Sequence, residues 1–265
     1  MTEAVTTGYA PVNGMELYWE SRGAGGTPLV VVHGGFGLTS MFGGLLDRLA
    51  ERRQVIAIEL QGHGHTRDID QPFSYQAFGD DVAAVVEQVA GGRADLFGYS
   101  LGSGACLRAA IQHPERVRQL GLVSTSVRRD DSYPEVLAAM AQVNSGGFDM
   151  VKQTPMYAAW RAVAPDVESF PVLMDKTGAL LQRPFDWSED VRRLTMPTLL
   201  VYGDADSISP ARAVANFALL GGGQADAGWD GSLPTPHRLA ILPGASHYDI
   251  LGAPTLGAVV DSFFS

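Results

Sequence analysis

A serine flanked by glycines is the strongest chemical signal in the sequence. Ser100 lies at the centre of Gly98-Tyr99-Ser100-Leu101-Gly102, directly after an apolar run and directly before a helical pattern. A turn this tight projects the serine hydroxyl beyond the end of a strand, and glycine fits best where the strand and helix approach each other. The Leu101 N–H would then lie at a helix N-terminus, where partial positive charge stabilises an anion. The pattern predicts a nucleophilic serine with one oxyanion donor beside it.

Two further segments supply the partners that an activated serine needs, which are a base and a carboxylate that orients the base. Asp204 and Asp206 follow one predicted strand, and His247 follows the last predicted strand. Serine, aspartate and histidine in this chain order form one known arrangement of the triad. Spacing alone does not choose between the two aspartates.

A glycine-rich segment, residues 33–37 (HGGFG), follows the apolar run at residues 29–32. Its backbone can approach a substrate oxygen closely, so the N–H of Gly35 or of Phe36 is the second oxyanion donor that we expect. The choice between these two residues stays open at this point.

Strands and helices that alternate along the chain are needed to bring these residues together. Continuous apolar runs are typical of strands that are buried on both faces, and apolar residues at helical spacing lie between them. The expected strands are residues 29–32, 54–60, 94–99, 117–124, 198–202 and 238–242, after a hairpin at Asn13-Gly14. The expected helices are residues 40–51, 75–89, 101–113, 211–220 and 253–264. The pattern indicates an α/β protein with a mostly parallel sheet flanked by helices.

The alternation stops between residues 127 and 195, where helical segments are punctuated by prolines. We therefore expect a core domain made of residues 1–126 and 196–265, interrupted by a helical cap at residues 127–195. The cap is rich in large apolar side chains, and a minority of them should line an acyl pocket. The expected pocket residues, including two from the core, are His33, Tyr99, Met140, Met156, Tyr157, Trp160 and Trp187.

Composition and charge argue against a protein that binds nucleic acid or membranes. The chain has 265 residues, of which 46% are hydrophobic and 18% charged, the balance of an ordinary soluble domain. Its net charge of −10 repels phosphate backbones and anionic lipid, so we expect no nucleic-acid and no membrane partner. We expect no signal peptide and no membrane span, because residues 1–20 show no basic cluster followed by an apolar run and no apolar run approaches the ~18 residues that span a bilayer. With Cys106 as its single cysteine, the chain is expected to be cytoplasmic.

Taken together, these motifs closely resemble those of the α/β-hydrolase superfamily, and in particular its capped serine esterases and lactonases. The resemblance covers almost the whole chain. It implies an eight-stranded sheet with a helical cap inserted after the sixth strand. It also implies that Ser100 is the nucleophile, His247 the base and Asp206, rather than Asp204, the acid.

One segment departs from the family pattern. Residues 59–66 (ELQGHGHT) are similar to the family's Asp-x-Arg-Gly-x-Gly-x-Ser turn but differ from it at Glu59, Gln61 and Thr66. These differences put in doubt how the floor of the active site is supported, and they leave the triad untouched.

The expected function is hydrolysis of a small carboxylic ester or lactone through an acyl-enzyme, with no cofactor and no metal, by a monomer or homodimer. C–C bond hydrolysis and cofactor-free perhydrolysis use the same triad and stay open. A ligand-binding protein of the same fold without turnover is the alternative from another class. The pair His63 and His65 suggests a metal site, but the Asp-His pair that such sites also need is missing.

Overall fold

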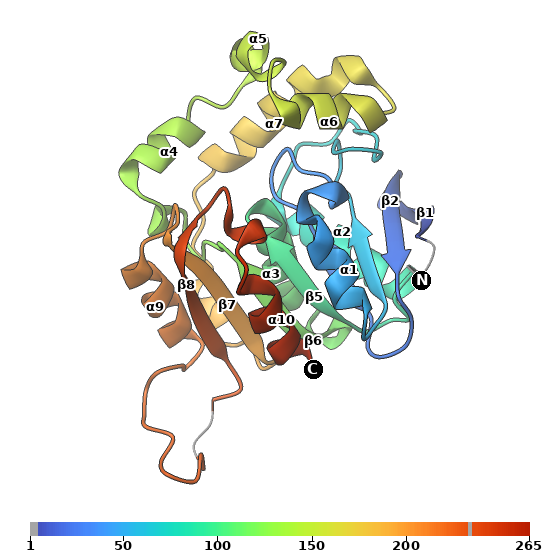
Figure 1. Ribbon diagram of the computed structural model, residues 1–265. Helices are drawn as coiled ribbons and strands as arrows, with labels where there is room; N and C mark the ends of the chain where they lie inside the picture. Colours follow the sequence, from blue (N-terminus) through green and yellow to red (C-terminus); the bar gives the residue numbers. More distant parts are fainter. Residues whose placement is uncertain (1–4, 233–234) are drawn as a thin grey trace.

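An eight-stranded sheet runs through the centre of the computed structural model, which describes residues 5–232 and 235–265 (Figure 1). The strands are β1 (Thr6–Val12), β2 (Met15–Arg22), β3 (Leu29–Val32), β4 (Val55–Ile58), β5 (Ala94–Tyr99), β6 (Val117–Val123), β7 (Thr198–Ala205) and β8 (Arg238–Ser246). Their order in the sheet is β1-β2-β4-β3-β5-β6-β7-β8. β2 is antiparallel to both of its neighbours, and all other pairs are parallel. The predicted fold class is confirmed.

Strand β3 shows why a continuous apolar run suits this sheet. Val30 and Val32 contribute to the core on one face, while Leu29 and Val31 contribute to the core on the other face. Successive side chains of a strand point to opposite faces, so both faces of the central strands must be covered.

Helices cover the two faces of the sheet as separate groups. One core contains side chains of α2 (Tyr75–Gln88), α3 (Leu101–Gln112) and α9 (Pro210–Leu219), and the other contains side chains of α1 (Gly44–Ala50) and α10 (Leu256–Phe264). All five were predicted, but α1 begins later than expected because residues Thr39–Phe42 form a 3₁₀ turn. Strands β7 and β8 run on beyond their predicted ends, because Ala205 still pairs with Ser246.

A helical region lies between β6 and β7, as the sequence predicts. It contains α4 (Pro134–Met140), α5 (Phe148–Val151), α6 (Pro155–Val163), α7 (Phe170–Gln182) and α8 (Ser188–Val191), and residues 127–195 form no strand. In Figure 1 the helices α4 to α7 lie above one end of the sheet. The Trp160 indole N–H donates to the Gly62 carbonyl at 3.2 Å, and Lys176 Nζ lies 2.7 Å from Asp68 Oδ2. These contacts hold α6 and α7 on the core.

The segment between α9 and β8 projects from the end of the sheet opposite the helical region (Figure 1). A connection from a helix back to a parallel strand lies at that end. Trp229 in this segment is fully exposed, and residues 233–234 lie outside the described part. No helix among the described residues has the length and apolar character needed to cross a bilayer.

Two buried histidines support the loop that follows β3. His33 donates from Nδ1 to the Gly34 carbonyl at 2.7 Å and accepts from the Leu60 N–H at Nε2. His63 donates from Nδ1 to the Gln61 carbonyl and accepts at Nε2 from the Phe36 N–H. Each ring uses one nitrogen as a donor and the other as an acceptor, which is the pattern of neutral imidazole. His33 is therefore a loop support and not the pocket residue that we expected.

Burial disfavours the charged form of both rings. It lowers the pKa of His33 from 6.5 to about 3, with a further contribution from His63, and it lowers the pKa of His63 from 6.5 to about 4. The unfolded chain therefore binds more protons than the folded chain below pH 6.5. Stability that is fully present above that pH is lost as the pH falls toward the folded-state pKa values.

We predict that acid destabilises the fold through these rings. As the pH falls from 6 to 5, each of the two histidines, which are neutral in the folded protein, should reduce the free energy of unfolding by about 1.4 kcal/mol. Urea denaturation across this range should show a shallower pH dependence for His63→Gln than for the wild type, by about the contribution of one histidine. The other titratable groups are present in both proteins, so identical slopes would contradict the prediction.

Candidate active site

The turn between β5 and α3 presents Ser100 at the end of the central strand. Its backbone has φ 53°, a conformation that is strained for any residue with a side chain. A Cβ on Gly98 would lie 2.4 Å from the Gly102 carbonyl oxygen, and a Cβ on Gly102 would lie 2.3 Å from the Val32 carbonyl oxygen. Both glycines are therefore required by the close approach of strand and helix.

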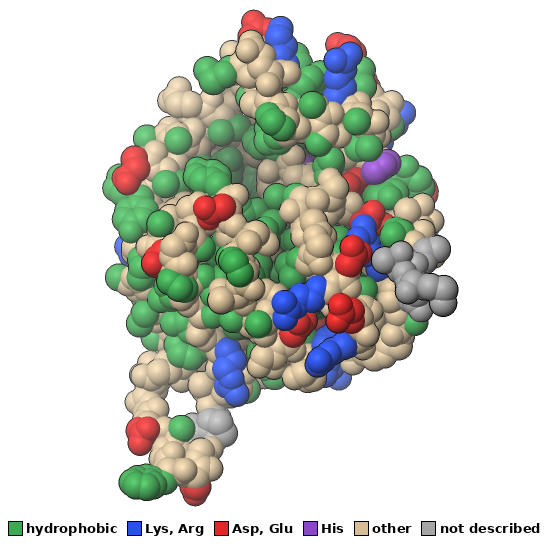
Figure 2. All heavy atoms as spheres, viewed as in Figure 1, with side chains coloured by type: hydrophobic (Ala, Val, Ile, Leu, Met, Phe, Trp, Pro, Cys, Tyr) green, Lys and Arg blue, Asp and Glu red, His purple; other side chains and the backbone are tan. Residues whose placement is uncertain are grey.

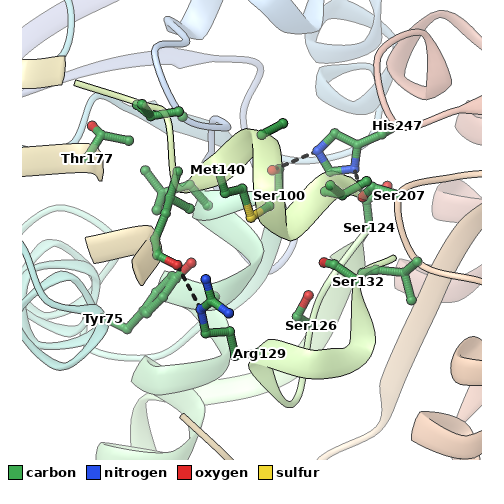
Figure 3. Close-up of a pocket in the computed structure, with 18 of the residues that line it drawn as sticks. Tyr75, Ser100, Ser124, Ser126, Arg129, Ser132, Met140, Thr177, Ser207 and His247 are labelled. Atoms are coloured by element: carbon green, nitrogen blue, oxygen red, sulfur yellow. Dashed lines mark hydrogen bonds between the residues drawn. The ribbon is translucent and has the colours of Figure 1, made fainter. Parts of the chain in front are cut away.

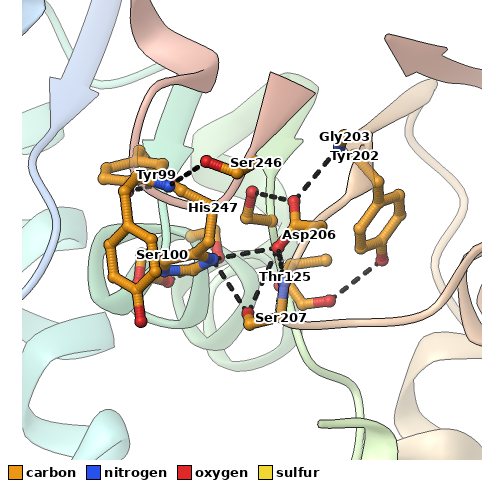
Figure 4. Close-up of polar contacts among 12 residues, drawn as sticks. Tyr99, Ser100, Thr125, Tyr202, Gly203, Asp206, Ser207, Ser246 and His247 are labelled. Carbon is orange, nitrogen blue, oxygen red and sulfur yellow. Dashed lines mark hydrogen bonds and ion pairs between the residues drawn. The ribbon is translucent and has the colours of Figure 1, made fainter. Parts of the chain in front are cut away.

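The structure brings Ser100, His247 and Asp206 into one line of hydrogen bonds (Figure 4). Ser100 Oγ lies 3.0 Å from His247 Nε2, and His247 Nδ1 lies 3.0 Å from Asp206 Oδ1. The three residues follow β5, β7 and β8, which are parallel strands. The carboxyl ends of parallel strands meet at one edge of a sheet, so residues far apart in sequence come together there.

Asp206 is buried and held by several donors besides His247. Its Oδ2 accepts from Ser124 Oγ at 2.5 Å and from the Gly203 N–H at 3.2 Å. Burial alone would raise the pKa of this carboxyl, but the hydrogen bonds from His247 and Ser124 outweigh it and keep the pKa below its ordinary value. Asp204 is exposed and accepts from the Gly244 N–H instead. The geometry therefore favours Asp206 as the partner of His247.

A second serine, Ser207, lies beside the histidine and was not singled out from the sequence. Its Oγ is 3.0 Å from His247 Nδ1 and donates to Asp206 Oδ1 at 3.2 Å. It faces the nitrogen on the carboxylate side, whereas Ser100 faces Nε2 on the cavity side. Ser207 is therefore placed to orient the ring, and Ser100 is placed to lose a proton to it. Its position next to Asp206 was the available signal.

Tyr99 supports His247 through a hydrogen bond and does not line the cavity. Its hydroxyl donates to the His247 carbonyl at 2.5 Å, and the side chain is buried. A Cβ on Gly34 would lie 2.8 Å from the Tyr99 ring, so the ring also fills the space beneath the loop after β3. The expectation that Tyr99 is a pocket residue is wrong because its side chain points into this packed layer.

The loop after β3 distinguishes the two candidate oxyanion donors. The Phe36 N–H donates to His63 Nε2 at 3.2 Å, so it is already paired. Gly35 faces Leu101, since a Cβ on Gly35 would lie 3.9 Å from the Leu101 side chain. Both Gly35 and Leu101 border the cavity next to Ser100. This geometry favours the N–H groups of Gly35 and Leu101 over the N–H of Phe36 as oxyanion donors.

A cavity of about 500 Å³ opens from Ser100 into the space beneath the helical region. Figure 2 shows the hollow on this face with mainly hydrophobic side chains around it, and Figure 3 shows its interior. Its walls come from the core and from α4 and α7 of the helical region. Besides Ser100 and the loop after β3, the lining includes Tyr75, Ser126, Arg129, Ser132, Glu135, Val136, Met140, Thr177, Leu181, Phe185, Trp187 and Tyr248.

Two of the seven expected pocket residues, Met140 and Trp187, line this cavity. Trp160 is buried against Phe170, with ring centroids 4.8 Å apart, and serves as an anchor of α6. Tyr157 packs on the same Phe170 ring at 5.0 Å. Met156 is partly exposed on the outside of α6. The helix α6 therefore uses its apolar face for docking, which sequence periodicity could not separate from pocket lining.

The divergent segment at residues 59–66 serves as support. Glu59 is buried, and its carboxylate accepts from the Thr39 N–H at 3.2 Å and from the His65 N–H at 2.7 Å. His65 Nδ1 also contacts this carboxylate at 2.9 Å. Within residues 5–232 and 235–265, no three His, Cys, Asp or Glu side chains are grouped so that they could hold a metal ion.

Comparison with known proteins places the chain among hydrolases. A relative from Neisseria meningitidis serogroup A, a pimeloyl-[acyl-carrier protein] methyl ester esterase, is 34% identical over 200 residues, which cover 69% of this chain and 62% of that protein. The chain thus spans less than two thirds of that relative. A 2-(acetamidomethylene)succinate hydrolase from Mesorhizobium japonicum is 26% identical and is matched over 86% of this chain and 84% of its own length.

Solved structures show the same fold. An E-2-(acetamidomethylene)succinate hydrolase superposes with a TM-score of 0.75 at 20% identity and covers 98% of this chain and 99% of that chain. The enol-lactonase of Burkholderia xenovorans superposes with a TM-score of 0.70 at 21% identity, over 96% of this chain and 98% of that chain. The family model described as alpha/beta hydrolase fold matches residues 27–172. On this evidence, the chain belongs to the α/β-hydrolase fold family.

Proposed function

We propose that this protein is a serine hydrolase that cleaves carboxylic esters through an acyl-enzyme intermediate. The observation that carries the proposal is the continuous line from Ser100 Oγ through His247 to Asp206, with both contacts at 3.0 Å and the serine facing an apolar cavity. The esterase named among the relatives supports an ester as the substrate. Lactones are cyclic esters, and they enter as a second substrate class to be tested.

In the acylation step, His247 Nε2 takes the proton of Ser100 Oγ while the oxygen attacks the ester carbonyl. His247 then becomes an imidazolium, which the adjacent Asp206 carboxylate stabilises. Asp206 keeps its pKa below the ordinary value, so it stays ionised while the histidine is protonated. His247 next gives its proton to the leaving alcohol, and the acyl group stays on Ser100.

The negative charge that develops on the carbonyl oxygen needs donors that are already in place. Gly35 and Leu101 border the cavity beside Ser100, and their N–H groups are the proposed donors, since preorganised donors stabilise the tetrahedral intermediate. In the deacylation step, His247 takes a proton from water, and the resulting hydroxide attacks the acyl-enzyme. The Ser100 oxygen leaves and recovers its proton from His247.

Residues 127–195 act, in this proposal, as a cap that encloses the acyl part of the substrate. Met140 from α4 and Leu181 from α7 line the cavity, so the helical region supplies much of the apolar wall. A cavity of about 500 Å³ is in the size range of small-molecule sites. This size favours short acyl chains or single rings over long lipids.

The first prediction of this function separates the two serines near His247. Ser100→Ala should lose covalent labelling by a fluorophosphonate probe and lower kcat on nitrophenyl esters by roughly 10³-fold or more. Ser207→Ala, the matched control, should keep stoichiometric labelling at Ser100, as read by mass spectrometry. Full turnover by Ser100→Ala, or labelling at Ser207, would refute the assignment.

The second prediction separates the two aspartates. Asp206→Asn leaves the shape intact but favours the wrong histidine tautomer, so kcat should fall on the order of 10³- to 10⁴-fold. Asp204→Asn changes an exposed side chain that accepts a hydrogen bond from the Gly244 N–H, and kcat should stay within a factor of about two to three. Equal losses in the two variants, measured on the same ester, would show that Asp206 is not the acid.

A further inference from the structure

One cation lines the cavity beneath the helical region without a carboxylate partner. Arg129 lies between β6 and α4, and its Nε donates to the Leu181 carbonyl of α7 at 3.1 Å. The backbone N–H of Arg129 donates to the Phe185 carbonyl at 3.1 Å. The first bond holds the side chain and the second holds the backbone, and Figure 3 shows the guanidinium turned into the cavity. Within the described part of the chain, no acidic oxygen lies within 4.0 Å of this guanidinium, and its terminal nitrogens make no hydrogen bond.

The neighbouring arginine differs from Arg129 in having carboxylate partners. Arg128 pairs with Asp131 at 3.0 Å and also contacts Asp130. Glu135 borders the same cavity as Arg129, but it is exposed and does not pair with it. A half-buried guanidinium beside apolar walls loses hydration and gains nothing from a counterion, which costs free energy unless a ligand supplies the missing charge.

Three side chains with hydroxyl groups line the same cavity as Arg129. Ser126, Ser132 and Tyr75 line the cavity, and the described residues offer no hydrogen-bond partner to these hydroxyls. In Figure 3, Tyr75 and Ser126 are drawn on either side of Arg129, and Ser132 lies farther from it, toward Ser124 and His247. Hydroxyl donors around a guanidinium fork match the oxygens of a carboxylate, which accepts up to about four hydrogen bonds.

We propose that Arg129, assisted by Ser126, Ser132 and Tyr75, binds a free carboxylate on the substrate. The preferred substrates are then esters that carry a second, unesterified carboxylate, such as monoesters of short dicarboxylic acids. The inference rests on the proposed ester hydrolysis at Ser100 and names its substrate class. The protein carries a net charge of −10, so its long-range field opposes anions, and the local guanidinium has to supply the recognition.

Matched substrates test the inference. Monomethyl adipate and methyl hexanoate have the same chain length and differ in the terminal carboxylate. We expect kcat/KM to be roughly 10- to 100-fold higher for monomethyl adipate, because a charge-assisted bidentate contact is gained. The hexanoyl ester of glycolate places the carboxylate on the alcohol side instead and shows which arm of the substrate reaches Arg129.

Variants connect that preference to Arg129. Arg129→Met should reduce the ratio of kcat/KM for monomethyl adipate to kcat/KM for methyl hexanoate by roughly 10- to 100-fold. Arg129→Lys keeps the charge without the fork and should lie between. Arg161→Met, which removes the same charge from an exposed site on α6 outside the cavity lining, is the control and should match the wild type.

A binding measurement keeps the inference independent of turnover. Adipate should bind to the Ser100→Ala protein in calorimetry, and binding should weaken roughly 10-fold or more when Arg129→Met is added. If no ester is hydrolysed and Ser100 is not labelled, the proposed function fails, and adipate binding still decides the carboxylate site. If neutral esters are hydrolysed but carboxylates bring no advantage and Arg129→Met affects both substrates equally, the carboxylate site is wrong and the esterase stands.

Discussion

The close approach of β5, β3 and α3 around Ser100 is the constraint on which the rest of the site depends. The serine backbone has φ 53°, and such strain persists only when the surrounding packing holds it. Gly98 and Gly102 permit that packing, because a Cβ on either would lie within 2.4 Å of a carbonyl oxygen. Since α3 begins directly after Ser100, the same turn sets both the hydroxyl and the Leu101 N–H.

Buried polar contacts then bring the other groups to that fixed point. Asp206 is held by Ser124 and Gly203 from the ends of two strands, and His247 is held by Asp206, by Ser207 and, through its carbonyl, by Tyr99. Charged and neutral partners share one small buried volume, where hydrogen bonds are strong and an unpaired group is costly. Such a network favours a single arrangement of the histidine ring.

The loop that faces Ser100 is supported in the same way by His63, which has to stay neutral to accept from the Phe36 N–H. Because this contact occupies the Phe36 N–H, it favours the Gly35 N–H as the donor that the loop presents to the cavity. It also ties the shape of the candidate oxyanion site to pH, because a protonated ring would offer a donor to another donor. The helical region completes the enclosure and brings Arg129 to the far side of the cavity.

Local patterns in the sequence determined the elements and the chemistry at the sheet edge. Apolar runs and helical spacing predicted the strands and helices, and the triad candidates followed because residues at the carboxyl ends of parallel strands must meet. The tertiary structure decided what depends on direction and packing. His33, Tyr99 and Trp160 point into packed layers instead of the cavity. The Phe36 N–H donates to His63, whereas the Gly35 N–H has no hydrogen-bond partner among the described residues. The roles proposed for Ser207 and Arg129 depend on their neighbours in the folded chain. Periodicity reports that a side chain is buried, whereas the partner against which it is buried is set by contacts between segments far apart in the chain.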